Sequence, residues 1–209
     1  MIKDLVFDLD GTLWDATECC AAAWVDTLAE IPGVRRDISR EDIQGICGMQ
    51  HSLAGERLFP SVDENRRNEL LALCYLAENR YLKQRGGRLY PDCIQVLETL
   101  SSRYNLYIVS NCQAGYIESF YYYHKTKKYF KDHECSGNTG LAKDRNIRML
   151  MDRNGIDSTI YLGDTEGDAE AARAVGIPFV YASYGFGESG GAEEVISSLS
   201  DLVSIAGRY

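Results

Sequence analysis

Four short apolar segments, separated by stretches of helical periodicity, constrain this chain of 209 residues to an α/β fold. Each segment has the length and the side chains that are typical of a buried strand. They occupy residues 5–7, 106–109, 159–162 and 177–181. Residues 93–103 and 145–154 place apolar side chains at helical spacing between them. Because strands that alternate with helices form a parallel sheet covered on both faces, we predict a Rossmann-like α/β core.

The interval from residue 15 to residue 87 departs from this alternation, because it holds helical patterns and no convincing strand. A length of 209 residues suits one core domain with a sizeable insertion better than two full domains. We therefore predict a core domain formed by residues 1–14 and 88–209. Residues 15–87 are predicted to form an inserted α-helical domain.

Two helices are predicted within this insertion. The first spans residues 16–30. The second begins at a capping box, in which the Ser61 hydroxyl and the Glu64 side chain satisfy free backbone N–H groups. It ends at Gly86-Gly87, which serves either as a hinge back into the core or as a plain loop.

The composition restricts the partners of the protein. With 45% hydrophobic and 25% charged residues, the chain is typical of a soluble globular protein. The formal net charge of -9 argues against nucleic acid, because binding to a phosphate backbone needs a basic patch, and it also disfavours a membrane surface. If the substrate is an anion, the protein must supply local positive charge through a divalent cation and one or two lysines.

The sequence also predicts the compartment. It shows no apolar h-region near its first residue and no run of about 20 apolar residues, so we expect a cytoplasmic protein without a membrane span. The seven cysteines include no CxxC pair and are interpreted as reduced thiols.

Polar side chains follow the predicted strands at the points where these strands end. They are Asp8, Asp10, Ser110, Asn111, Asp164 and Asp168, with Lys143 at the start of a helix. The carboxyl edge of a parallel sheet is where ligands bind. Each signal alone has an ordinary explanation, such as a turn, a helix cap or a solvated lysine. Together and in this order, they favour phosphoryl transfer.

Asp8 is the predicted nucleophile, because a carboxylate can split phosphoryl transfer to water into two displacements through a mixed anhydride. Asp10 is the predicted general acid and base, which protonates the departing alkoxide and then deprotonates the attacking water. Gly11 permits the turn that brings the Asp10 side chain over the phosphoryl site. Ser110 and Lys143 are predicted to stabilise charge on the phosphoryl oxygens.

A metal site is predicted among the same carboxylates. Two carboxylates and a phosphate repel one another, so a hard cation with oxygen ligands is required, and Mg²⁺ matches. The predicted ligands are Asp8, the backbone carbonyl of Asp10, and Asp164. Asp168 is predicted either to orient Lys143 or to meet the metal through water.

With these residues in place, the chain resembles the haloacid dehalogenase-like hydrolase superfamily over nearly its whole length. The resemblance is carried by Asp8-Leu9-Asp10-Gly11-Thr12, Ile108-Val109-Ser110-Asn111, Lys143, and Gly163-Asp164-Thr165-Glu166-Gly167-Asp168. Within the superfamily, the tail Tyr184-Gly185-Phe186-Gly187 is similar to that of the phosphoglycolate phosphatase branch. One departure concerns Lys143: Asp144 follows it where a proline is common, and Lys131 is the alternative lysine.

The resemblance implies a type 1 helical cap that closes over the site and sets specificity. The loop Gly48-Met49-Gln50-His51 is the implied substrate-binding part of this cap, and Asn111 is assigned to substrate binding from the core side. The implied substrate is a small phosphorylated metabolite, which the sequence does not identify. We expect a monomer.

Three functions remain open within this resemblance. The favoured one is a Mg²⁺-dependent phosphatase that forms an aspartyl-phosphate on Asp8. Dehalogenases lack the second aspartate of the first motif, so Asp10 argues against that reaction. A phosphosugar mutase of the β-phosphoglucomutase type and a non-catalytic phosphate-binding regulatory protein are the alternatives.

Overall fold

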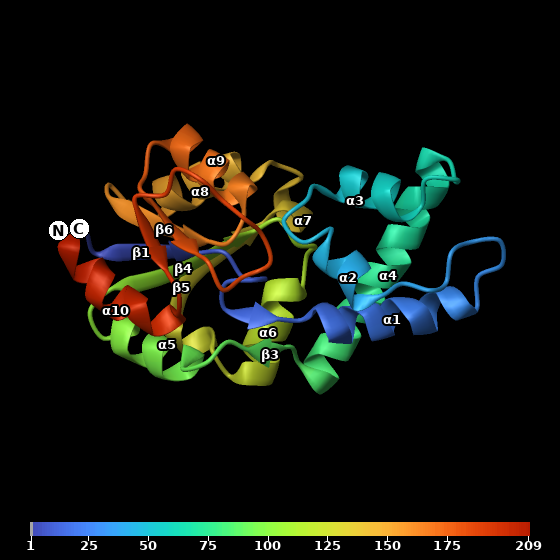
Figure 1. Ribbon diagram of the computed structural model, residues 1–209, viewed down its shortest axis with the longest axis horizontal. Helices are drawn as coiled ribbons and strands as arrows, with labels where there is room; N and C mark the ends of the chain where they lie inside the picture. Colours follow the sequence, from blue (N-terminus) through green and yellow to red (C-terminus); the bar gives the residue numbers. More distant parts are fainter. Residues whose placement is uncertain (1) are drawn as a thin grey trace.

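A parallel six-stranded sheet forms the centre of the larger part of the protein, as shown by a computed structural model that describes residues 2–209 (Figure 1). The spatial order of the strands is β5-β4-β1-β6-β7-β8, and every pair in this sheet is parallel. The strands are β1 (Asp4–Phe7), β4 (Asn105–Ser110), β5 (Phe130–Cys135), β6 (Thr159–Gly163), β7 (Phe179–Ala182) and β8 (Glu194–Ile196). The predicted α/β class is confirmed.

The four predicted strands correspond to the four central strands β4, β1, β6 and β7, whereas the two edge strands were not predicted. β5 carries the polar run Lys131 to Glu134, in which Asp132 and Glu134 pair with Arg153 at 2.7 and 2.5 Å. β8 has only three residues. An edge strand is half-solvated, so neither segment needs the apolar run by which buried strands are predicted.

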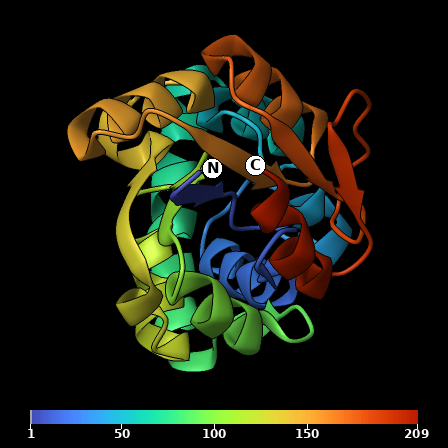
Figure 2. The same cartoon turned by 90° about the vertical axis from the view of Figure 1, so that its left-hand side faces the viewer.

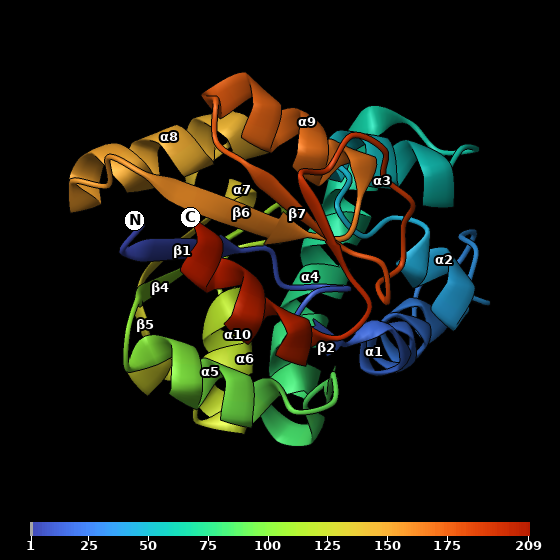
Figure 3. The same ribbon diagram turned by 60° about the vertical axis from the view of Figure 1, so that its left-hand side comes forward.

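Helices cover both faces of the sheet (Figures 2 and 3). Leu5 and Phe7 of β1 contribute to the hydrophobic core on one face, whereas Val6 contributes to the core on the other, as the alternation of side chains in a strand requires. The first face is covered by α5 (Cys93–Ser101), α6 (Tyr116–His124) and α10 (Leu202–Ile205). The second is covered by α8 (Lys143–Asn154) and α9 (Glu166–Val175).

Four further helices lie together beyond the carboxyl edge of the sheet (Figure 1). They are α1 (Thr17–Ala29), α2 (Arg40–Gln44), α3 (His51–Leu58) and α4 (Glu64–Arg85). Trp24 of α1 stacks on Phe59 with ring centroids 6.1 Å apart, and both side chains are buried. A short antiparallel pair, β2 (Trp14–Asp15) with β3 (Arg88–Leu89), lies where the chain leaves and re-enters the sheet part.

The predicted helix over residues 16–30 is confirmed as α1, but the predicted capping box of α4 is wrong. Asp63, not Ser61, is the N-cap residue, and its carboxylate accepts a hydrogen bond of 3.0 Å from the Arg66 backbone N–H. Asp63 stands immediately before the helix and has its own acceptor, so Ser61 is not needed. The end at Gly86, which has a φ of 70°, is confirmed.

The remaining helical elements are short. They are α7 (Ser136–Thr139), η1 (Lys127–Tyr129), η2 (Leu199–Asp201) and η3 (Ala206–Arg208). Among residues 2–209, no helix combines the length and the apolar character that crossing a membrane requires. All seven cysteines carry free thiols.

Candidate active site

The carboxyl ends of three adjacent strands bring the predicted polar residues together. Phe7 of β1 lies in register with Ile108 of β4 and with Leu162 of β6. Asp8 therefore emerges between the end of β4, which carries Ser110, and the loop after β6, which carries Asp164. The sheet topology alone thus places these side chains at one edge.

Lys143 lies between two carboxylates in the interior. Its Nζ donates to Asp8 Oδ1 at 2.9 Å and to Asp168 Oδ1 at 2.5 Å, and all three side chains are buried. Burial alone would lower the pKa of Lys143, but the charges of Asp168 and Asp8 raise this pKa well above its ordinary value. The alternative lysine, Lys131, is exposed on β5, so Lys143 is the lysine that the structure places beside Asp8.

The same lysine influences Asp8. Burial raises the pKa of Asp8 to about 6, and the charge of Lys143 opposes this rise. Asp168 is held in place on its other side, where Oδ2 accepts hydrogen bonds from the Thr165 hydroxyl at 2.7 Å and backbone N–H at 3.0 Å. Both oxygens of Asp168 are thus used within the protein. This geometry favours orientation of Lys143, the first of the two roles predicted for Asp168.

Asp164 has the features of a cation ligand. Its Oδ2 accepts a hydrogen bond of 2.7 Å from the Phe186 backbone N–H, whereas its buried Oδ1 has no hydrogen-bond partner. Burial, followed by the nearby charge of Asp8, raises the pKa of Asp164 to about 7. Each of Asp8, Asp164 and Asp168 can offer an oxygen within 4.8 Å of the others. An all-oxygen set with an unpaired buried carboxylate oxygen fits a hard divalent cation such as Mg²⁺.

Two glycines make room for Asp164. A Cβ atom on Gly11 would lie 2.1 Å from Asp164 Oδ2, and one on Gly185 would lie 2.5 Å from the same atom. Gly11 also has a φ of 79°, which only glycine adopts without strain. Gly11 thus lies in a turn, as predicted, and its lack of a Cβ leaves room for Asp164.

Asp10 is held by a residue that the sequence did not single out. The Tyr116 hydroxyl, from α6, donates a hydrogen bond of 2.8 Å to Asp10 Oδ1. Burial raises the pKa of Asp10 well above its ordinary value, and the hydrogen bond from Tyr116 opposes this rise. No sequence signal marks Tyr116, because the contact joins residues that are 106 positions apart.

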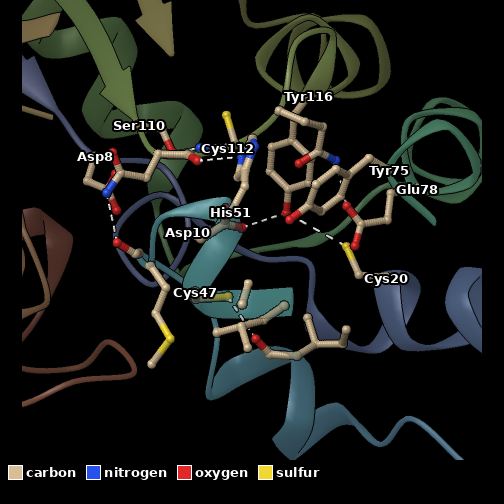
Figure 4. A pocket seen from close by; sticks show the side chains of 17 residues that line it. Asp8, Asp10, Cys20, Cys47, His51, Tyr75, Glu78, Ser110, Cys112 and Tyr116 are labelled. Atoms are coloured by element: carbon tan, nitrogen blue, oxygen red, sulfur yellow. Dashed lines mark hydrogen bonds between the residues drawn. The ribbon is translucent and has the colours of Figure 1, made fainter. Parts of the chain in front are cut away.

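A cavity of about 60 Å³ joins this cluster to the helices α1–α4 (Figure 4). On the sheet side it is lined by Asp8, Asp10, Ser110, Asn111, Cys112, Gln113 and Tyr116. On the side of the helices it is lined by Cys20, Ile43, Ile46, Cys47, Gly48, Met49, His51, Ala54, Tyr75 and Glu78. Of the four predicted loop residues, Gln50 alone does not line the cavity. It is exposed, because it is the N-cap residue of α3 and lies outside the cavity wall.

Asn111 holds the loop before α3 against the sheet part. Its Nδ2 donates to the Gly48 carbonyl at 2.8 Å, its Oδ1 accepts from Ser136 at 2.8 Å, and its carbonyl pairs with His51 Nε2 at 3.1 Å. Burial lowers the pKa of His51, which favours the neutral ring. The side chain of Asn111, which is predicted to bind substrate, makes these contacts within the protein and also lines the cavity.

Glu78 of α4 is a second lining residue that the sequence did not single out. It is 4% exposed, and its carboxylate accepts hydrogen bonds from Trp24 Nε1 and from Gln113 Nε2. Burial raises its pKa to about 7, and these two hydrogen bonds oppose the rise. In the sequence, Glu78 is one of three acids on this helix, so nothing marks it as buried.

The family model described as haloacid dehalogenase-like hydrolase matches residues 5–182. Among curated proteins, the chain is 26% identical to a phosphoglycolate phosphatase of Aliivibrio fischeri, over 100% of this chain and 94% of that protein. It is 28% identical to a phosphoglycolate phosphatase of Vibrio vulnificus, over 98% and 96% of the two chains.

Two solved structures illustrate the likeness of fold. A haloacid dehalogenase-like family hydrolase of Streptococcus pneumoniae, SP0104, superposes with a TM-score of 0.81 at 22% identity and 98% coverage of both chains. CbbY of Rhodobacter sphaeroides, solved in complex with phosphate, superposes with a TM-score of 0.77 at 17% identity, with 97% of this chain and 96% of that chain covered.

Proposed function

Since this chain belongs to the haloacid dehalogenase-like hydrolase family, we propose that it is a Mg²⁺-dependent phosphatase that hydrolyses small phosphate monoesters through an aspartyl-phosphate on Asp8. One observation carries the proposal: the buried Lys143 bridges Asp8 and Asp168, beside the unpaired oxygen of Asp164. This arrangement combines a fixed carboxylate nucleophile, the positive charge of Lys143 and a place for a divalent metal cation.

In the first half of the reaction, an Asp8 carboxylate oxygen attacks phosphorus and the bond from phosphorus to the ester oxygen breaks. Lys143 contacts Oδ1 of Asp8, so we assign the attack to Oδ2. Asp10 donates its proton to the departing alkoxide, which leaves as the alcohol. Ser110, at the end of β4, donates its hydroxyl to a phosphoryl oxygen.

In the second half, water attacks the phosphorus of the aspartyl-phosphate, and the bond to the Asp8 oxygen breaks. Asp10, now ionised, accepts the proton of this water, so both carboxylates return to their starting states. Asp8, Asp164 and the Asp10 carbonyl would hold the Mg²⁺ ion, which when bound neutralises charge on the phosphoryl oxygens. Lys143, kept in position by Asp168, stabilises the negative charge that develops on the phosphoryl oxygens.

We further propose that residues 15–87 act as a cap on a core formed by residues 1–14 and 88–209. The contacts of Asn111 with Gly48 and His51 support a closed arrangement of the two parts. Closure of such a cap would exclude bulk water from the phosphoryl site. The seven free thiols suit a reducing compartment, and we propose that the protein acts in the cytoplasm. We also propose that it acts as a monomer.

A panel of phosphate esters tests the proposed function. Phosphoglycolate is the first ester to include, because the curated relatives are named for it. We expect release of inorganic phosphate that requires Mg²⁺ and stops when the metal is chelated. Movement of phosphate between positions of a sugar phosphate would support a mutase instead. Phosphate binding without release from any ester would support the regulatory alternative.

A further inference from the structure

The cavity carries a buried carboxylate at the end opposite to the phosphoryl site. Figure 4 shows Asp8 and Ser110 at one end of the cavity and Glu78 with Cys20 at the other, with Asp10 between them. An ester whose phosphoryl group lies against Asp8 therefore extends its alcohol part past Asp10 towards Glu78. The cavity between the two ends is small, about 60 Å³, which favours a short alcohol part.

Among the described residues that line the cavity, none is a lysine or an arginine. His51 is half-buried, and burial lowers its pKa, so it does not supply a positive charge. Lys143 is engaged by Asp8 and Asp168 at the other end. Above about pH 7, where Glu78 is ionised, a carboxylate on the substrate would thus meet Glu78 without any cation to balance the two charges.

Glu78 retains the capacity to accept a hydrogen bond from a ligand. One oxygen accepts from Trp24 and the other accepts from Gln113 at 2.5 Å. A carboxylate offers about four acceptor sites, so about two remain. A glutamine at this position would keep the acceptor for Trp24 Nε1, and its NH2 group could donate to the side-chain oxygen of Gln113 once the Gln113 amide is turned over, so Glu78→Gln removes the charge and keeps both partners.

We infer, on the basis of the proposed function, that Glu78 selects phosphate monoesters of short alcohols that end in a hydrogen-bond donor, a hydroxyl or an ammonium group. The same carboxylate rejects esters that end in a carboxylate, phosphoglycolate included. A site built to hydrogen-bond a substrate donor discriminates strongly against an analogue without one, because its buried polar group is then left unpaired. Repulsion between two carboxylates in a buried site adds to this discrimination.

Three esters that share the phosphoryl-oxygen-methylene unit test the inference at about pH 8, where Glu78 is ionised: 2-hydroxyethyl phosphate, phosphoethanolamine and phosphoglycolate. We expect kcat/KM for one or both of the first two to exceed that for phosphoglycolate by at least about tenfold. The comparison of hydroxyl with ammonium identifies the donor. A higher kcat/KM for phosphoglycolate than for both others would overturn the inference and leave the proposed phosphatase function intact.

Glu78→Gln tests the residue itself. We expect this variant to raise kcat/KM for phosphoglycolate at least about tenfold relative to that for the preferred ester. The control is Glu69→Gln, which removes an exposed acid from the same helix, α4, and is expected to leave the ratio unchanged. Far-ultraviolet circular dichroism checks that both variants are folded. An unchanged ratio in folded Glu78→Gln would contradict the assignment.

Measurements of binding affinity test the selectivity independently of catalysis. Calorimetry with Mg²⁺ and the Asp8→Asn variant measures the affinity for each of the three esters without turnover. We expect the same rank order, with phosphoglycolate weakest. If wild type releases phosphate from none of the esters but this rank order holds, the proposed function fails and the selectivity stands. Equal affinities, or the tightest binding for phosphoglycolate, would overturn the selectivity.

Discussion

The Tyr116 hydroxyl donates a hydrogen bond of 2.8 Å to Asp10 Oδ1 and so ties α6 to the loop after β1. Burial raises the pKa of Tyr116 well above its ordinary value, which keeps this hydroxyl protonated as a donor. Asp10 is thereby fixed in one orientation at the cavity wall. Tyr116 is a positioning residue in this account, because it acts through Asp10.

Tyr116→Phe removes this hydrogen bond and keeps the ring that packs against Trp14. A hydrogen bond between neutral groups contributes about 0.5–1.5 kcal/mol, so we expect kcat to fall by about threefold to tenfold with little change in KM. Steady-state kinetics on the best ester of the panel measures both constants. Tyr122→Phe, at an exposed position of the same helix, is the control. Equal kcat values for the two variants would contradict the role of Tyr116.

Lys143→Met leaves Asp8 and Asp168 buried without their shared cation. Loss of one partner from a buried ion pair costs about 3–5 kcal/mol, so we expect the free energy of unfolding to fall by an amount of this order. We also expect phosphate release to fall at least about a hundredfold. Urea denaturation and a phosphate assay measure the two effects. Lys131→Met, at an exposed position of β5, should change neither; similar losses in both variants would count against the assignment.

Gly11→Ala and Gly176→Ala form a matched pair. The two glycines have φ values of 79° and 80°, but a Cβ on Gly176 meets nothing within 4 Å, whereas one on Gly11 collides with Asp164. The left-handed backbone alone costs a residue with a Cβ about 1–2 kcal/mol, which we expect for both variants. Only Gly11→Ala should also weaken the activation by Mg²⁺, as measured by titrating the metal in the phosphate assay. Identical metal dependence in the two variants would be inconsistent with a cation beside Asp164.

The pKa of Glu78, raised by burial from 4.5 to about 7, makes stability depend on pH. Between these values the folded protein keeps a proton that the unfolded chain has lost, so the free energy of unfolding falls as the pH rises from about 4.5 to about 7. At about 1.4 kcal/mol for each pKa unit, this effect amounts to about 3 kcal/mol. Glu78→Gln lacks this pH dependence. Urea denaturation across this range should show that the free energy of unfolding of the variant rises relative to that of wild type as the pH rises. Parallel pH profiles would contradict a buried, titrating Glu78.

The sequence was sufficient to predict those site residues and strands that a local pattern marks. Asp8, Asp10 and Asp164 follow apolar runs that form central strands, and parallel strands end at one edge of a sheet. Lys143 was separated from Lys131 only by the structure, because burial depends on how α8 packs on the sheet. The edge strand β5 was not predicted, because its residues are largely polar and resemble a loop. Its strand conformation depends on its pairing with β4, which a local pattern does not show.

Long-range contacts account for what the sequence could not predict. Glu78 and Gln113 are 35 residues apart, and Tyr116 is 106 residues from Asp10. Their hydrogen bonds arise from how α1–α4 pack against α6 and the loop after β4. No spacing rule within a single element reports on such packing, so neither residue was predicted.

The most direct test of the aspartyl-phosphate mechanism is the rate of Mg²⁺-dependent phosphate release by Asp8→Asn on the best ester of the panel. The substitution keeps the shape of the side chain and removes the nucleophilic carboxylate. We expect the rate to fall by about a thousandfold or more while circular dichroism shows a folded protein. A folded Asp8→Asn protein that retains Mg²⁺-dependent release within about tenfold of wild type would contradict the account.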